Sequence, residues 1–149
     1  MAAELTEVVY ACKVTVRGGR GGHARSADGR LDVDLSPHAD KSGTGTNPEQ
    51  LFAAAYAACF HSALEAEAKG AGVDLSDSTI VAQVSLGPTS QGGFGLAVTL
   101  DLEAPALDAQ KARALLHAAH QRCPYSAAIR GNVGVRFLLG GKPLAPAAA

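Results

Sequence analysis

The sequence contains three cysteines, Cys12, Cys59 and Cys123, and the thiol is the side chain in this chain best suited to redox or metal chemistry. Most free cysteines act as small buried hydrophobic residues, and Cys12, within an expected strand, fits that interpretation. In a reducing compartment a cysteine pair is more often catalytic or metal-binding than structural. Because three is an odd number, at least one cysteine must lie outside any pair.

Cys59 and Cys123 stand in different local contexts. Cys59 lies in the middle of an apolar helical stretch, where a buried packing role is the ordinary interpretation. Cys123 comes at the end of a predicted helix, directly before Pro124, where the backbone can shift locally. A cysteine that forms a disulfide with a thiol initially out of bonding distance needs a backbone that can shift in this way. A packing role at the helix end remains the alternative for Cys123.

A reactive thiol must be ionised near neutral pH, and this requires a stabilising charge or dipole. Cys59 follows Pro48 by 11 residues, roughly 16 Å along a helix, whereas a helix dipole acts only over the first turn. A fixed cation is therefore needed, and Arg20, framed by glycines between positions 18 and 22, is the best candidate. Glu49 could hold its guanidinium through two hydrogen bonds. The alternatives are a solvated turn residue for Arg20 and a dipole-stabilising carboxylate for Glu49.

Apolar periodicity and turn-forming residues predict the elements that position these side chains. Strands are expected at residues 8–16, 24–26, 31–35, 79–86, 93–102 and 133–139, with helices at residues 48 to about 69 and 108 to about 123. Asn47, Pro48 and Glu49 form a strong helix start, and Gly70 begins its stop signal. The order β-β-β-α-β-β-α-β indicates one α+β domain over residues 1–149, with a flexible tail from about residue 140.

The first predicted helix is apolar nearly all round from Leu51 to Ala63. A helix with this pattern is buried on most of its sides. In a chain of 149 residues, we expect a second subunit to help cover it.

Composition argues against several classes of partner. Thirteen basic and fourteen acidic residues give a formal net charge of −1, so there is no electrostatic footprint for nucleic acid or an anionic membrane. The N-terminus lacks the basic-then-apolar layout of a signal peptide. The apolar stretch from Leu51 to Leu64 is too short to span a bilayer. We therefore expect a cytoplasmic protein.

Several blocks of sequence are more specific than any of these patterns. They are GGR at residues 18–20 before SADG at 26–29, GTNPEQLFAA at 45–54 with ACF at 58–60, AHQ at 119–121 with CPYS at 123–126, and RGN at 130–132. Together these blocks resemble the Ohr (organic hydroperoxide resistance) branch of the Ohr/OsmC family. They extend from about Tyr10 to Phe137 in the family's order and spacing, which makes the resemblance highly specific.

This resemblance implies a thiol peroxidase that reduces alkyl or fatty acid hydroperoxides. Cys59 would be the peroxidatic cysteine and Cys123 the resolving cysteine that forms a disulfide with it, while Arg20 would activate Cys59 and Glu49 would hold Arg20. The implied fold is OsmC-like, with antiparallel sheets wrapped around central helices in an intertwined homodimer. The disulfide would be reduced by dihydrolipoamide or a lipoylated protein, with no metal, haem or other cofactor.

The resemblance also implies an apolar channel for the peroxide. We expect four side chains to line it: Phe52, Phe60, Phe94 and Tyr125. Ordinary core packing is the alternative for the three phenylalanines. An alkyl tail would be preferred over hydrogen peroxide in such a channel.

Two positions depart from the family's pattern. Gly21 stands where an acidic residue usually follows the arginine, and Ala127-Ala128-Ile129 stands where Asn-Ala-Thr is usual. We expect the first departure to alter the mobility of the Arg20 loop. We expect the second to alter the local hydrogen bonding after Cys123. His61 and Cys12 are given no role.

Other functions compete with this interpretation. A metal-binding protein could use His117, His120 and Cys123, which recur every three residues on one predicted helix, together with Cys59 and His61. However, His61 is two residues from Cys59 and so points to another face of its helix, and there is no CxxC. A non-enzymatic thiol sensor could use the same two cysteines, although no appended DNA-binding or partner module is evident. A peroxidase of the OsmC branch would share the chemistry with a different substrate range.

Overall fold

A computed structural model describes residues 2–145. The described chain divides after Pro48 into two compact units. Its strands and helices follow the predicted succession, with the 3-10 helix η1, the short helix α3 and the strand β7 as additions. The predicted α+β class is therefore confirmed, whereas a single domain over residues 1–149 remains a prediction.

The first unit is a three-stranded antiparallel sheet in which β2 lies between β1 and β3. Its elements are β1 (Val14–Arg17), η1 (Gly19–Gly21), β2 (His23–Ser26) and β3 (Asp32–Asp34). The prediction of a first strand over residues 8–16 was too long, because residues 8–13 belong to no strand. β1 pairs with β2 from Arg17 opposite His23 to Val14 opposite Ser26, and beyond this register one backbone hydrogen bond joins Ala27 to Lys13.

The glycines around Arg20 are required by the backbone. Gly18 and Gly19 have positive φ angles of 76° and 57°, a region that disfavours other residues. A Cβ at Gly22 would lie 1.6 Å from the carbonyl oxygen of Arg17, so no larger residue fits there. These glycines fix the turn η1 that carries Arg20.

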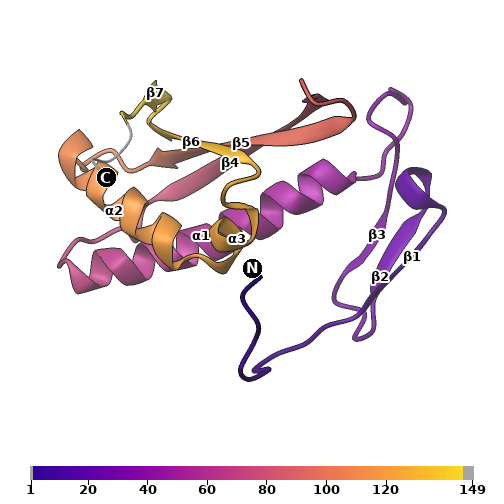
Figure 1. Cartoon of the computed structure of the whole chain (residues 1–149), viewed down its shortest axis with the longest axis horizontal. Coiled ribbons are helices and arrows are strands. Elements are labelled where there is room, and N and C mark those ends of the chain that lie inside the picture. Colours follow the sequence, from indigo (N-terminus) through magenta and orange to yellow (C-terminus); the bar gives the residue numbers. More distant parts are fainter. Residues whose placement is uncertain (1, 146–149) are drawn as a thin grey trace. The chain divides into compact units, whose positions relative to one another are not determined.

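The second unit contains a four-stranded sheet with the order β4-β5-β6-β7. The elements from α1 onwards are α1 (Pro48–Gly70), β4 (Thr79–Pro88), β5 (Phe94–Glu103), α2 (Ala109–Arg122), α3 (Pro124–Ile129), β6 (Gly134–Leu139) and β7 (Lys142–Pro143). β4 and β5 form an antiparallel hairpin, whereas β5 and β6 are parallel and are joined by a crossover through α2 and α3. Both long helices pack on one face of this sheet (Figure 1).

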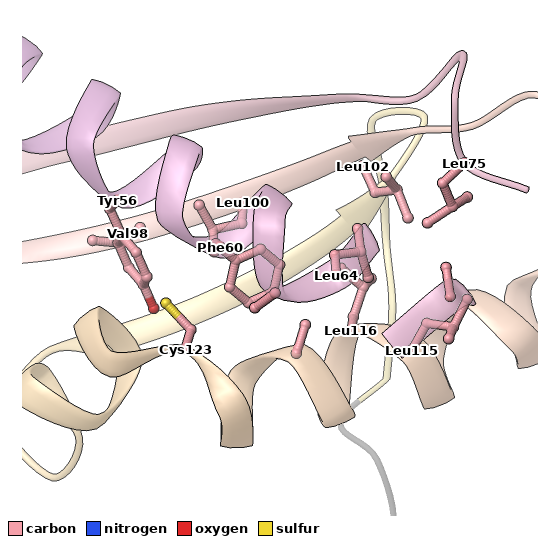
Figure 2. Close-up of a cluster of buried hydrophobic side chains, with 13 residues drawn as sticks. Tyr56, Phe60, Leu64, Leu75, Val98, Leu100, Leu102, Leu115, Leu116 and Cys123 are labelled. Atoms are coloured by element: carbon pink, nitrogen blue, oxygen red, sulfur yellow. The ribbon is translucent and has the colours of Figure 1, made fainter. Parts of the chain in front are cut away.

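The core lies between that sheet face and the two long helices (Figure 2). α1 contributes residues spaced by four, Tyr56, Phe60 and Leu64, and β5 contributes alternate residues, Val98, Leu100 and Leu102, all at most 2% exposed. These spacings are those of one helix face and one strand face. Each fully buried side chain of this size contributes about 1.5–3 kcal/mol to the hydrophobic free energy of folding.

Within the described residues of the second unit, one face of α1 is buried against the core. Ala54, Ala55 and Ala58, away from the core, are exposed. The prediction that this helix is buried on most of its sides is therefore not met within the second unit alone. The second subunit that would cover the rest stays a prediction.

Pro124 follows the end of one helix and begins another. The second long helix was predicted to end at about Cys123, and α2 does end at Arg122, but Pro124 also begins α3. Proline is favoured at a first helical position because that residue needs no N–H partner. Cys123 thus caps the end of one helix and the start of the next.

The expected flexible tail also needs correction. Lys142 and Pro143 form β7, which pairs with Leu139 and Leu138 of β6 after a turn through Gly140 and Gly141. The rest of the predicted tail, from residue 146, lies outside the described residues. Within the described chain no helix is long and apolar enough to cross a membrane, and the expected cytoplasmic location stays a prediction.

Candidate active site: a thiol pair

The structure brings Cys59 and Cys123 together although 64 residues separate them in the chain. Their Sγ atoms are 3.7 Å apart and both thiols are free. A disulfide is about 2.05 Å long, so the sulfurs must approach by about 1.7 Å to bond. Cys123 is completely buried, whereas Cys59 is partly exposed. A reactant from solution therefore meets Cys59 first.

Cys123 occupies the junction of α2 and α3. Its N–H donates to the carbonyl of Ala119 in α2 (2.8 Å), and its own carbonyl accepts from the N–H of Ala127 in α3 (3.0 Å). Its φ of −68° and ψ of 123° are extended rather than helical. Figure 2 shows its sulfur directed towards α1, close to Tyr56. A single extended residue between two helices is the place where the backbone can adjust when the sulfurs approach.

A buried hydrogen bond ties the two cysteine-bearing segments together. The Tyr56 hydroxyl and the Ser126 Oγ are 2.6 Å apart, and both side chains are fully buried. Tyr56 lies three residues before Cys59, and Ser126 lies three residues after Cys123. The bond therefore links α1 to the first turn of α3. Sequence reasoning missed this pair, and its only signal was a polar residue at helical spacing from each cysteine.

The immediate surroundings of Cys59 do not favour its thiolate. Burial raises the pKa of the Cys59 thiol, and the Cys123 sulfur raises this pKa further. The backbone N–H of Tyr125 acts in the opposite direction by hydrogen bonding to the sulfur. Burial also raises the pKa of Tyr56, so its hydroxyl stays protonated. A reactive Cys59 therefore needs a further positive charge.

Several aromatic rings pack against one another along the part of α1 that carries Cys59. Phe60 is fully buried and stacks on Phe137 with ring centroids 5.6 Å apart. Phe52 meets the ring of Tyr56 edge-on at 6.3 Å, and the half-exposed Tyr125 stacks on Tyr56 at 6.4 Å. Of the four predicted wall residues, Phe52, Phe60 and Tyr125 are thus grouped near the cysteine pair.

The fourth predicted wall residue, Phe94, lies elsewhere in the second unit. It is 77% exposed at the start of β5. It lines a cleft beside the β4–β5 turn together with Gly131 and Val133, and neither Cys59 nor Cys123 belongs to that lining. Cys12 was interpreted as a small buried residue within the first strand, but it is exposed and lies before β1. His61, which has no assigned role, hydrogen bonds to Ser78 at 2.9 Å.

Arg20 and Glu49 lie on opposite sides of the division between the two units. Arg20 is carried by η1 of the first unit, and Glu49 occupies the first turn of α1 in the second. Their predicted roles towards each other and towards Cys59 remain predictions.

The proposed metal ligands do not gather into a site. Among the described residues there is no group of three or more His, Cys, Asp or Glu side chains arranged to hold a metal ion. His120 instead packs edge-on against Phe137 at 5.4 Å, and His61 is engaged with Ser78. The metal-binding alternative thus lacks a ligand set in this part of the chain.

The sequence and fold both match proteins of known family. A model of OsmC-like proteins matches residues 39–137. The chain belongs to the OsmC-like family. It is 54% identical over 134 residues to the organic hydroperoxide resistance protein OhrB of Bacillus subtilis, covering 88% of this chain and 98% of OhrB. The crystal structure of OhrB superposes with a TM-score of 0.81 and 51% identity, covering 89% of this chain and 99% of that one.

A second relative supports the same branch. The organic hydroperoxide resistance protein of Xanthomonas axonopodis is 43% identical over 137 residues, covering 89% of this chain and 96% of its own. The predicted Ohr branch of the family and the OsmC-like fold are therefore confirmed.

Proposed function

We propose that this Ohr-branch protein is a cysteine-dependent peroxidase that protects against organic hydroperoxides. The observation that carries the proposal is the pair of free thiols at 3.7 Å, one partly exposed and one fully buried. The names of its Bacillus and Xanthomonas relatives point to the same class of oxidant.

The reaction begins with attack by the Cys59 thiolate on the outer oxygen of the hydroperoxide. The O–O bond breaks, the alkoxide leaves and takes a proton to become an alcohol, and Cys59 becomes a sulfenic acid. The Cys123 thiol then attacks the Cys59 sulfur, water leaves, and the disulfide forms. An external dithiol reduces this disulfide by thiol exchange and is itself oxidised to a disulfide.

Arg20 supplies the positive charge that the surroundings of Cys59 call for. Burial and the neighbouring Cys123 sulfur raise the Cys59 pKa, and an arginine stays charged even where water is scarce. Its guanidinium would stabilise both the thiolate and the charge that develops on the peroxide oxygens. Glu49, at the start of α1, would hold this guanidinium in place.

The aromatic side chains close to Cys59 and Cys123 in the sequence favour an organic substrate. Phe52 and Tyr125, which are partly exposed, would present apolar surface to an alkyl or fatty acid chain, whereas Phe60 is fully buried in the core. Hydrogen peroxide has no alkyl chain and would gain no binding energy from these apolar contacts. Phe94 would line the channel only if a neighbouring segment or subunit brings it to the substrate.

A homodimer and a lipoyl-type reductant complete the proposal. The exposed alanines Ala54, Ala55 and Ala58 give α1 a flat apolar face that a second copy of the chain would cover. A dihydrolipoyl dithiol, free or carried by a protein, suits the last step because it closes into its own cyclic disulfide.

Steady-state peroxide consumption tests the proposal. Purified protein with dihydrolipoamide should reduce cumene hydroperoxide much faster than hydrogen peroxide, and Cys59→Ser should abolish turnover. Cys12→Ser is the matched control and should retain full activity. Formation of the disulfide without repeated turnover would instead favour a thiol sensor.

A further inference from the structure

A separate cavity lies in the second unit, between α2 and the strands β6 and β7. Its volume is about 390 Å³, which is within the range of small-molecule sites. Neither Cys59 nor Cys123 lines it. Phe137 does line it and stacks on Phe60, the neighbour of Cys59. The cavity is thus adjacent to the thiol pair without being part of it.

One wall of this cavity is basic. Arg113, His117 and His120 lie at positions i, i+4 and i+7 of α2 and so share a helix face. Among the described residues that line the cavity, none is acidic. The electrostatic preference of this wall is therefore for an anion.

Two buried nitrogen atoms on this wall have no hydrogen-bond partner among the described residues: Arg113 Nε and His120 Nδ1. Both atoms lie beneath the cavity surface, so a ligand in the cavity would meet the remaining nitrogen atoms of these two side chains. Burial, followed by Arg130 and His117, lowers the pKa of His120. At neutral pH its imidazole is therefore neutral and can donate through one nitrogen.

The opposite wall is apolar. Val135 and Phe137 of β6 and Leu144 after β7 line it, and the exposed Arg136 between the two β6 residues adds a second guanidinium to the lining. A small inorganic anion would leave this wall without a partner, whereas an alkyl chain would cover it.

We propose that this cavity binds a monocarboxylate with an apolar tail, of the size of a medium-chain fatty acid. The carboxylate lies against the basic face of α2 that Arg113, His117 and His120 form, while the tail lies against the wall formed by β6 and the segment after β7. A planar group with two oxygen atoms suits one guanidinium and one imidazole donor.

The site has a direct structural link to the resolving cysteine. His120 lies three residues before Cys123, and its carbonyl accepts a hydrogen bond from the Arg130 guanidinium at 2.8 Å. A carboxylate held by His120 would therefore rest on the last turn of the helix that ends at Cys123. Binding does not depend on peroxidase activity, so the two proposals can fail separately.

Isothermal titration calorimetry with octanoate tests the site in the full chain. Octanoate should bind, while octanol and acetate, each lacking one half of the ligand, should bind at least tenfold more weakly. Arg113→Gln should weaken octanoate binding by about tenfold or more. Lys111→Gln removes the same charge from an exposed position of α2 outside this cavity and should leave the affinity unchanged.

A second measurement needs no substitution in the cavity. The imidazole NMR signals of His120 should shift on addition of octanoate to the wild-type protein. Arg20→Gln should not change the affinity, because a carboxylate bound in the peroxide channel would depend on Arg20 instead. The proposal is wrong if octanoate does not bind, if acetate binds as well, if Arg113→Gln behaves like Lys111→Gln, or if affinity depends on Arg20.

Discussion

The hydrogen bond between Tyr56 and Ser126 should position Cys123 for disulfide formation. Both hydroxyls are fully buried and 2.6 Å apart. Tyr56→Phe would leave the Ser126 oxygen buried without its partner, which costs about 1–3 kcal/mol of folding free energy. Ser126→Ala would do the same to the tyrosine hydroxyl. The double variant leaves neither group unpaired, so its loss should be much smaller than the sum.

A double-mutant cycle in urea unfolding measures this directly. We expect a coupling free energy of about 1–3 kcal/mol between the two positions. Tyr125→Phe is the matched control, because this neighbouring tyrosine is 45% exposed and its substitution should change stability by less than about 0.5 kcal/mol.

The same variants should separate the two chemical steps. Because Ser126 lies in the first turn of the helix that Cys123 caps, losing the bond should slow condensation of the Cys59 sulfenic acid with Cys123. Peroxide attack on Cys59 should keep its rate, as measured by stopped-flow mixing. Additive effects in the cycle, with unchanged disulfide formation, would refute the positioning role.

Three further predictions concern the thiols and the first unit. Cys123→Ser should still consume one equivalent of organic peroxide and accumulate a Cys59 sulfenic acid detectable by dimedone labelling; loss of the first step would mean that Cys123 does more than resolve. Arg20→Gln should raise the Cys59 pKa and shift the rate of peroxide attack to higher pH, while Arg17→Gln serves as control; identical pH profiles would remove Arg20 from the mechanism. Hydrogen bonds to two aspartates raise the pKa of His23, so its stabilisation is complete below its unfolded value of about 6.5 and is lost as pH rises through the higher folded value. His23→Gln should flatten this pH dependence of chemical unfolding, and an unchanged slope would contradict it.

The long helix α1 could be predicted from sequence almost to the residue. Asn47, Pro48 and Glu49 are local start signals and Gly70 is a local stop, and helix ends depend on such local chemistry. The strand that was predicted to begin at Val8 shows the opposite case. Its β-branched composition is suitable, but a strand also needs a partner, and the pairing ends at Val14.

The candidate site was predictable only in part. Nothing in the spacing of Cys59 and Cys123 gives their 3.7 Å separation, which depends on how α2 packs against α1. The pairing of Cys59 with Cys123 was predicted only from the resemblance to the Ohr branch. The Tyr56–Ser126 bond and the cavity beside Arg113 and His120 depend on tertiary packing in the same way. The small helix α3 was missed because proline both ends one helix and begins another.

The central claim is that an organic hydroperoxide oxidises Cys59 and Cys123 to a disulfide. The most direct test mixes fully reduced protein with one equivalent of cumene hydroperoxide and maps the products by peptide mass spectrometry under non-reducing conditions. We predict rapid loss of both thiols, a crosslink between Cys59 and Cys123, and an unmodified Cys12. Unreacted thiols, or a crosslink that involves Cys12, would contradict the account.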